Sequence, residues 1–216
     1  MIIHQMALGP IQANCFILGC EQTRQAVVID PGDDSDRILT RLAGDGLTVA
    51  HIVNTHGHFD HVGANKRLKE VTGADILIHR ADAAMLSQLS ATAAAWGLAA
   101  ENSPPADRLL EDGDRIVFGT HELKVLHTPG HTPGGICLYT EYEQAGTPKK
   151  AVFVGDTLFA GSIGRTDFPG GSFDTLISSI RNQLFNLADE VAVYPGHMGT
   201  TTIGGERRSN PFCGQG

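Results

Sequence analysis

Apolar residues along this chain occur mainly in short runs that alternate with polar turns, a pattern typical of β-strands. The first half of the chain has such runs at residues 14–18, 26–30, 51–55 and 75–79. The second half has them at residues 115–118, 123–128, 136–140, 151–157 and 191–197. Because helical segments follow the strands in both halves, the pattern predicts a mixed α/β chain built from two similar halves.

A longer apolar period predicts helices at residues 35–46, 62–73 and 173–187. Ser35 or Asp36 is the candidate N-cap of the first helix, Gly73 closes the second, and Ser172 is a suitable cap for the third. Residues 80–110 are rich in alanine and contain two consecutive prolines near their end, so we expect a helix followed by a loop there.

Size and composition fit a soluble globular protein. The chain has 216 residues, with 41% hydrophobic and 19% charged, and we expect one domain over residues 1–216. A net charge of −8 without a basic cluster argues against a nucleic-acid partner. No run approaches the ~20 apolar residues of a membrane span. The four cysteines contain no CxxC pair, which is typical of reduced thiols, and we expect a cytoplasmic location without a membrane partner.

One short segment concentrates metal-binding side chains. Residues 54–63, NTHGHFDHVG, contain His56, His58, Asp60 and His61. Three more candidates follow predicted strands, in GH, GD and GH pairs: His131, Asp156 and His197. Strand ends hold functional groups on a rigid frame, so these seven side chains are candidate ligands of one centre.

The number of candidates favours two metal ions over one. A catalytic zinc ion takes about four ligands and keeps one position open for water. A division that uses all seven gives His56, His58 and His131 to one ion. Asp60, His61 and His197 then bind the other, and Asp156 bridges the pair. An isolated histidine is more often structural than ligating, and we assign the remaining five to that class: His4, His51, His79, His121 and His127.

The arrangement THxHxDH…GH…GD…GH resembles the metallo-β-lactamase superfamily over nearly the whole chain. The segment VVIDPG at residues 27–32 also matches, and the resemblance implies that Asp30 supports the metal loop from behind the ligands. It further implies a four-layer αββα sandwich in a single domain.

Within that superfamily the chain is most similar to the glyoxalase II group of hydroxyacylglutathione hydrolases, in its short bacterial form. This likeness implies hydrolysis of a small-molecule thioester, of the S-lactoylglutathione type, by a hydroxide that bridges two divalent ions. Zinc is the expected metal, with iron or manganese as alternatives. Asp60 is a candidate for moving a proton during catalysis, and Arg165 in GSIGRTDF is the candidate substrate contact.

Two features differ from the classical glyoxalase II pattern. The companion tyrosine of that family falls on Asp167, and only 19 residues follow His197, so we expect no separate C-terminal helical domain. In that family both features help to hold glutathione, so their absence argues against glutathione as the thiol carrier here.

A second resemblance leaves a different chemistry open. The segment GRTDF is also similar to persulfide dioxygenases of the same fold, which bind one iron; the ligands here would be His56, His131 and Asp156. A metal-binding protein without catalytic activity is the third alternative. Asp60 and His61 carry the difference between the first two, since only a second ion requires them.

Overall fold

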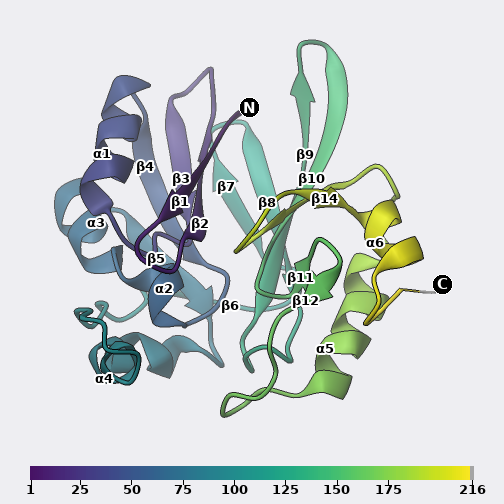
Figure 1. Ribbon diagram of the computed structural model, residues 1–216. Helices are drawn as coiled ribbons and strands as arrows, with labels where there is room; N and C mark the ends of the chain where they lie inside the picture. The colour runs from purple at the N-terminus through teal and green to yellow at the C-terminus, as the bar shows by residue number, and fades with distance from the viewer. Residues whose placement is uncertain (215–216) are drawn as a thin grey trace.

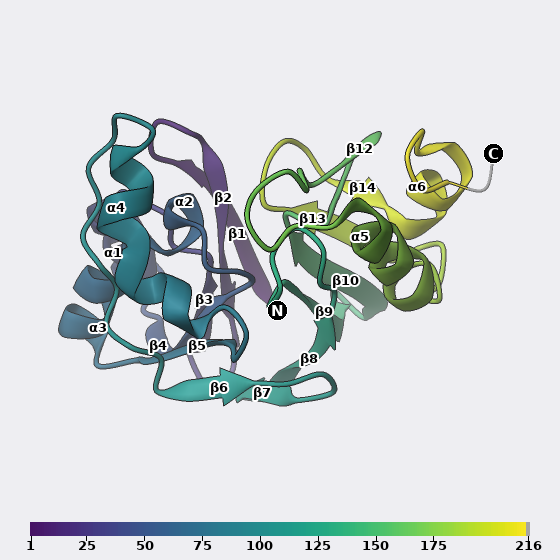
Figure 2. The same cartoon turned by 90° about the horizontal axis from the view of Figure 1, so that it is seen from below.

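Two β-sheets packed face to face form the centre of the computed structural model, which describes residues 1–214. Figure 2 shows α1, α3 and α4 on the outer side of one sheet and α5 and α6 on the outer side of the other. The four-layer αββα sandwich expected for a single domain is therefore confirmed.

Each of the two large sheets has six strands. The first contains, in spatial order, β1 (Ile2–Leu8), β2 (Ala13–Gly19), β3 (Gln25–Ile29), β4 (Thr48–Asn54), β5 (Asp75–His79) and β6 (Arg108–Leu110). The second contains β14 (Thr201–Thr202), β13 (Ala192–Pro195), β10 (Thr147–Gly155), β9 (Ile136–Gln144), β8 (His121–His127) and β7 (Arg115–Phe118). A separate ribbon pairs β11 (Leu158–Phe159) with β12 (Ser162–Ile163).

The helices fall between and after these strands (Figure 1). They are α1 (Ser35–Gly44), α2 (Phe59–Val62), α3 (Asn65–Thr72), η1 (Ala83–Gln88), α4 (Leu89–Ala94), α5 (Phe173–Ser179), η2 (Ile180–Leu184) and α6 (Ile203–Ser209). Among residues 1–214, none is both long and apolar enough to cross a membrane.

The core between the sheets is made of apolar side chains from both halves. Phe16 of β2 meets Phe153 of β10 edge to face, with ring centroids 5.1 Å apart. Each fully buried phenylalanine contributes on the order of 1.5–3 kcal/mol through removal of apolar surface from water. Each sheet also packs against its own helices through one further apolar cluster. This packing fixes the facing ends of the strands, where the candidate site lies.

The helix predicted at residues 62–73 is confirmed as α3 (Asn65–Thr72) but begins three residues later than expected, because Val62 is the last residue of a separate helix, α2. The amide of Ala64 donates to the Pro31 carbonyl at 2.9 Å, which replaces a helical bond. Gly63 lies so close to Gly32 that an added Cβ would come within 2.3 Å of the Gly32 carbonyl oxygen. Contact with the neighbouring loop therefore interrupts the helix. Gly73 closes α3 in the left-handed conformation, as predicted.

Two other expectations differ from the structure. The N-cap of α1 is Asp34, in a left-handed conformation, and not Ser35 or Asp36. Residues 80–110 contain η1 and α4 as expected for a helix, but also the short strand β6. Edge strands β1 and β14 were not predicted.

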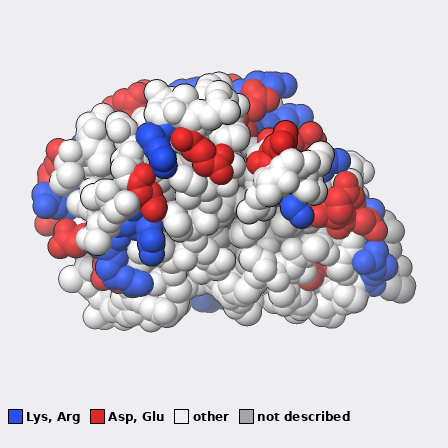
Figure 3. Space-filling model, turned by 90° about the horizontal axis from the view of Figure 1, so that it is seen from above, with Lys and Arg blue, Asp and Glu red and all other residues white. Residues whose placement is uncertain are grey.

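Charged side chains on the face seen in Figure 3 are mixed in sign. Lysine and arginine lie among aspartate and glutamate on that face and form no continuous basic surface there among the described residues.

Candidate metal centre

The seven candidate ligands lie where strands of both sheets end. The loop after β4 carries His56 and His58, and the short helix α2 that follows it carries Asp60 and His61. His131 follows β8, Asp156 follows β10 and His197 follows β13. The centre therefore lies on the seam between the two halves of the fold.

Three histidines form a first group. The ligand nitrogens of His56, His58 and His131 lie within 4.8 Å of one another. Nδ1 of His58 and Nε2 of His131 are 2.9 Å apart. Nε2 of His56 is buried and has no hydrogen-bond partner among the described residues. A buried nitrogen of this kind is costly unless something binds it, and a metal ion would do so.

A second group lies beside the first. The ligand atoms of Asp60, His61 and His197 also lie within 4.8 Å of one another. Nε2 of His61 and Nε2 of His197 are 3.3 Å apart, and His197 Nε2 is 3.3 Å from Asp60 Oδ2. Two nitrogens and one carboxylate oxygen thus converge on one point.

Asp156 lies between the two groups. Its Oδ2 is 3.7 Å from His131 Nε2 in the first group and 3.6 Å from His197 Nε2 in the second. Its Oδ1 is buried without a hydrogen-bond partner among residues 1–214 and lies 3.4 Å from His61 Nε2. The structure brings all seven candidate residues together; that they hold metal stays a prediction.

The electrostatics of the cluster suit a bound cation. Burial, together with the neighbouring histidines, holds the pKa of His56 well below its usual value, and lowers that of His58 to about 4. Both rings are therefore neutral near pH 7, which is the ligating form of imidazole. Burial lowers the pKa of His61, but the carboxylates of Asp156 and Asp60 outweigh it and raise that pKa to about 10. This concentration of negative charge favours a cation at that point, so the residues present fit a metal centre.

Hydrogen bonds behind the cluster orient two of the rings. Asp30 accepts from the amide of Thr55 at 2.7 Å and from its hydroxyl at 2.6 Å. Asp30 Oδ2 also lies 3.1 Å from His61 Nδ1, so a proton on that nitrogen leaves Nε2 free to face the centre. His131 Nδ1 donates to the Arg165 carbonyl at 2.7 Å, so the Nε2 of His131 is also free to face the centre. The position of Asp30 agrees with the supporting role expected for it.

Asp82 is a residue that the sequence analysis missed. Its carboxylate is fully buried and accepts from the amide of Gly57 at 3.1 Å and from that of Gly134 at 2.6 Å. One amide belongs to the loop of His56 and His58, and the other to the loop of His131. Asp82 thus ties together the two loops of the three-histidine group. The signal available in the sequence was a carboxylate three residues after a predicted strand.

Tight packing in the loop after β13 places His197. An added Cβ at Gly196 would lie 2.4 Å from Asp156 Oδ1 and 2.7 Å from His61 Cε1. Asn14 of β2 holds the same loop from the other sheet, donating to the carbonyls of Pro195 at 2.9 Å and Met198 at 3.0 Å.

The side chain of Arg165 lies at the rim of the centre. Its guanidinium forms two hydrogen bonds with Asp167, at 2.8 and 2.7 Å. It also stacks over Phe168, 3.7 Å from the ring centroid, and Phe168 lies 5.8 Å from the ring of His58. Trp96, which is 54% exposed, lies 6.1 Å from Phe168. The charge of Arg165 is thus already paired with Asp167, and its role as a substrate contact stays a prediction.

Comparisons with known proteins agree with this geometry. The family model of the metallo-beta-lactamase superfamily matches residues 8–197. The hydroxyacylglutathione hydrolase GloC of Haemophilus influenzae is 39% identical over 214 residues, which cover 98% of each chain.

Three solved structures are similar over nearly the whole chain. The B3 metallo-beta-lactamase BLEG-1 has a TM-score of 0.87 at 36% identity and covers 98% of this chain and 99% of its own. TTHA1623, in a di-iron-bound form, has a TM-score of 0.84 at 39% identity, covering 97% and 99%. ETHE1 of Myxococcus xanthus has a TM-score of 0.79 at 34% identity, covering 99% and 85%. Because one family model spans most of the chain and these relatives share both its length and its fold, the chain belongs to the metallo-β-lactamase superfamily.

Proposed function

We propose that this protein is a binuclear metal-dependent hydrolase that acts on thioesters, as in the glyoxalase II group. The observation that carries the proposal is the second group of side chains. Asp60, His61 and His197 converge beside the three histidines, with Asp156 between the two groups. A single-ion enzyme has no need of this second group.

In this proposal His56, His58 and His131 would hold one divalent ion, and Asp60, His61 and His197 would hold the other. Asp156, which lies between the two groups, would be shared by them. When bound, the ions supply Lewis acidity, which lowers the pKa of water towards neutrality and polarises the thioester carbonyl. Zinc is the expected metal, and iron is supported by the di-iron form of TTHA1623.

Groups of the protein itself orient the histidine rings and set the charge of Asp60. Asp30 and the Arg165 carbonyl fix the rings of His61 and His131, so their Nε2 atoms stay directed at the centre. The pKa of Asp60 is held far below its usual range by His61 and His197, despite the opposing effect of burial. Asp60 is therefore ionised at neutral pH, which is the form in which its Oδ2 would bind a cation; its role in moving a proton stays a prediction. A departing thiol with a pKa of about 8.5 leaves without a strong general acid.

The first experiment is a thioester screen on purified protein, with metal quantified in the same sample. S-lactoylglutathione is the first substrate to test, because GloC is a hydroxyacylglutathione hydrolase. About two metal ions per chain and release of free thiol are expected. Protein with a full metal complement that cleaves no thioester would sink the proposal.

A variant at His58 tests the site itself. We expect His58→Ala to lose activity by at least about a hundredfold and to bind less metal, because one ligand of the three-histidine group is gone. Far-ultraviolet circular dichroism should show that the variant is folded. His121→Ala, which alters a histidine outside the cluster, is the matched control and should retain both activity and metal. Full activity in His58→Ala would refute the site.

A mononuclear iron dioxygenase is the second candidate. It is supported by the segment GRTDF and by the likeness to ETHE1 at 34% identity. Its ligands would be His56, His131 and Asp156. One iron per chain together with oxygen uptake that depends on a persulfide would establish it in place of the hydrolase.

A further inference from the structure

Four aromatic rings, of His58, Phe168, Trp96 and Phe59, form a row along one side of the metal centre. The ring of Phe168 lies 5.8 Å from that of His58 and nearly perpendicular to it, at 86°. Trp96 meets Phe168 edge to face, with ring centroids 6.1 Å apart, and lies 6.5 Å from Phe59. Because His58 belongs to the three-histidine group, this aromatic row begins at a candidate ligand.

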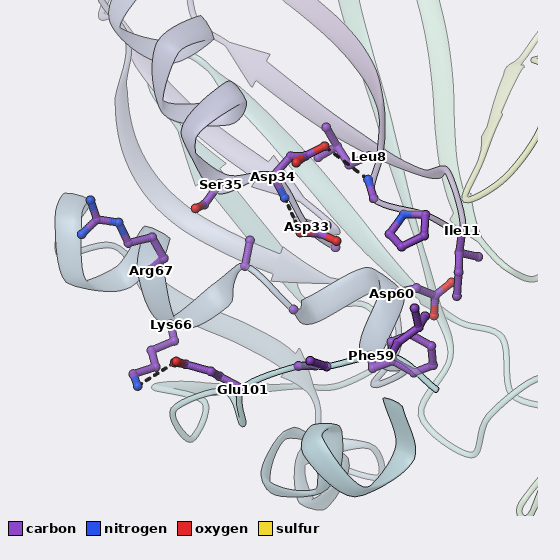
Figure 4. Close-up of a pocket in the computed structure, with 18 of the residues that line it drawn as sticks. Leu8, Ile11, Asp33, Asp34, Ser35, Phe59, Asp60, Lys66, Arg67 and Glu101 are labelled. Carbon is purple, nitrogen blue, oxygen red and sulfur yellow. Dashed lines mark hydrogen bonds and ion pairs between the residues drawn. The ribbon is translucent and has the colours of Figure 1, made fainter. Parts of the chain in front are cut away.

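The aromatic row joins the two halves of the fold. Trp96 follows α4 in the first half, and Phe168 lies in the loop before α5 in the second. Phe59 begins α2 and lines a cavity of about 480 Å³, where it lies beside Asp60, as Figure 4 shows. The row therefore adjoins both groups of candidate ligands, at His58 and at Asp60.

Neighbouring groups hold the ring of Phe168 in place. The guanidinium of Arg165 lies over it, 3.7 Å from the ring centroid, and is itself fixed by two hydrogen bonds to Asp167. The cation–π contact and the edge-to-face contacts with His58 and Trp96 restrict how the ring can turn. A ligand that packs on a ring already fixed costs the protein little conformational entropy, so this surface is preorganised for binding.

Trp96 leaves a large aromatic surface open to solvent. The residue is 54% exposed, although it packs against both Phe59 and Phe168. Single exposed apolar residues are common on protein surfaces and by themselves indicate nothing. Trp96 differs from such residues because its partner Phe168 adjoins the ring of a candidate ligand, His58. Aromatic side chains beside a small number of polar groups are the usual lining of a small-molecule site.

The rings are the main contact that this surface offers to a ligand. The guanidinium of Arg165 lies over Phe168 and 5.9 Å from the ring of Trp96, but its charge is paired with Asp167. A flat apolar group gains both burial of its surface and a stacked or edge-to-face contact against such rings. The chemistry that fits is therefore an aromatic or other flat apolar substituent.

We propose that Trp96 and Phe168 bind a flat apolar group of the substrate, and that Trp96 sets the preference for such groups. This inference rests on the proposed thioester hydrolysis and adds a specificity-determining residue to it. Among 2-hydroxyacyl thioesters, a phenyl substituent in place of methyl changes this contact and leaves the reacting bond the same. The contact places no demand on the net charge of the thiol carrier.

The first test compares mandeloyl with lactoyl thioesters, each made with glutathione and with N-acetylcysteamine. The two acyl groups differ only in a phenyl ring against a methyl group. Each kcat/KM is divided by the rate constant of hydroxide-catalysed hydrolysis of the same ester, which removes differences in intrinsic reactivity. A second comparison, of the lactoyl thioesters of 2-phenylethanethiol and N-acetylcysteamine, covers the case in which the thiol half carries the ring.

We expect the corrected kcat/KM to be about five- to twentyfold higher for the ester with the ring, and the comparison that shows it identifies the half that lies on Trp96. Trp96→Ala should reduce this preference about three- to tenfold, whereas Trp96→Phe should keep most of it. Circular dichroism should show both variants folded, since the side chain is more than half exposed. Phe212→Ala removes another half-exposed ring, outside the aromatic row, and is the matched control that should leave the preference unchanged.

The emission of Trp96 measures the same contact without turnover, because it is the only tryptophan of the chain. The probes are three thioethers, which have no carbonyl and are not hydrolysed. S-benzyl-N-acetylcysteamine carries a ring in place of the acyl half, methyl 2-phenylethyl sulfide carries one on the thiol half, and S-methyl-N-acetylcysteamine carries none. We expect one ring-bearing thioether to change the emission of the metal-loaded protein saturably, with a dissociation constant at least about threefold lower than that of the methyl compound.

The possible results separate the two proposals. Equal corrected rates with and without the ring in both comparisons, or a preference that survives Trp96→Ala, overturn the role of Trp96 and leave thioester hydrolysis standing. Failure of metal-loaded protein to cleave any ester overturns thioester hydrolysis itself. In that case the thioethers still decide the other question: tighter binding of a ring-bearing thioether supports the aromatic contact, and equal or absent binding overturns it.

Discussion

At the scale of single residues, Asp82 shows how a buried carboxylate can control a site it does not enter. Its two oxygens accept from Gly57 and Gly134, which belong to different loops of the three-histidine group. Without these bonds two amide groups would be buried without partners, and the histidines on either side would lose their fixed spacing.

We therefore expect Asp82→Asn to weaken selectively the binding of one of two metal equivalents, the one held by the three-histidine group. An asparagine keeps one acceptor oxygen and presents an NH₂ group to the other amide. The affinity for that equivalent should fall about ten- to a hundredfold, while the second equivalent changes little. Metal titration of the apoprotein by calorimetry measures both. Equal weakening of both equivalents, or none, would contradict this reading; Asp36→Asn is the exposed control.

The seven candidate ligands can be found in the sequence, whereas the supporting residue Asp82 cannot. All seven candidate ligands were identifiable because each follows a strand, and parallel and facing strands bring their ends together. Asp82 was not, because its partners lie 25 and 52 residues away and no local pattern links them. The pairing of Arg165 with Asp167, two residues on, was within reach of the sequence.

At the scale of elements, α5 begins beside the loop of His131. Ser172 Oγ accepts from the Thr175 amide at 3.4 Å and from its hydroxyl at 2.8 Å, as its predicted role as N-cap requires. The Ser172 amide donates to the Gly130 carbonyl at 2.8 Å, next to His131. The cap therefore stabilises both the helix and its junction with the site.

Ser172→Ala should lower the free energy of unfolding by about 1 kcal/mol, the usual cost of a lost N-cap. Urea unfolding followed by circular dichroism measures the change. Ser172→Asp should recover most of it, because aspartate also caps well, and Ser178→Ala on the same helix should have a smaller effect. An unchanged midpoint in Ser172→Ala would show that the cap is dispensable.

Elements differ in how far the sequence predicts them. Strands such as β2, buried along its whole length, give a continuous apolar run that is visible in sequence. The edge strand β1 is only partly buried, and β14 has two residues that pair only with β13, so neither has a clear apolar pattern. The break between α2 and α3 depends on the contact with Gly32, which is a tertiary effect.

At the scale of the whole molecule, buried thiols link stability to alkaline pH. Burial raises the pKa of Cys137 to about 12, although Thr128 and Thr157 oppose it, and burial also raises that of Cys15. Above the unfolded-state pKa of about 8.5, the unfolded chain loses the proton while the folded one keeps it. The unfolded state then binds fewer protons, so stability falls as pH rises from there towards the folded-state pKa.

We expect a decline of about 1.4 kcal/mol per pH unit for each such thiol above about pH 9. Urea midpoints between about pH 8 and 10.5 measure the slope. Cys137→Ala should be less stable at pH 8 but should show a shallower decline, because one titrating group is gone. Parallel slopes in the two proteins would rule out this origin.

The position of the centre on the seam links metal binding to the stability of the whole fold. His61 and His197 are 136 residues apart in the chain, and His58 and His131 are 73 apart. An ion bound by such partners would join the two halves of the fold and would lose its site when the chain unfolds. The free energy of unfolding would therefore rise with the concentration of free metal.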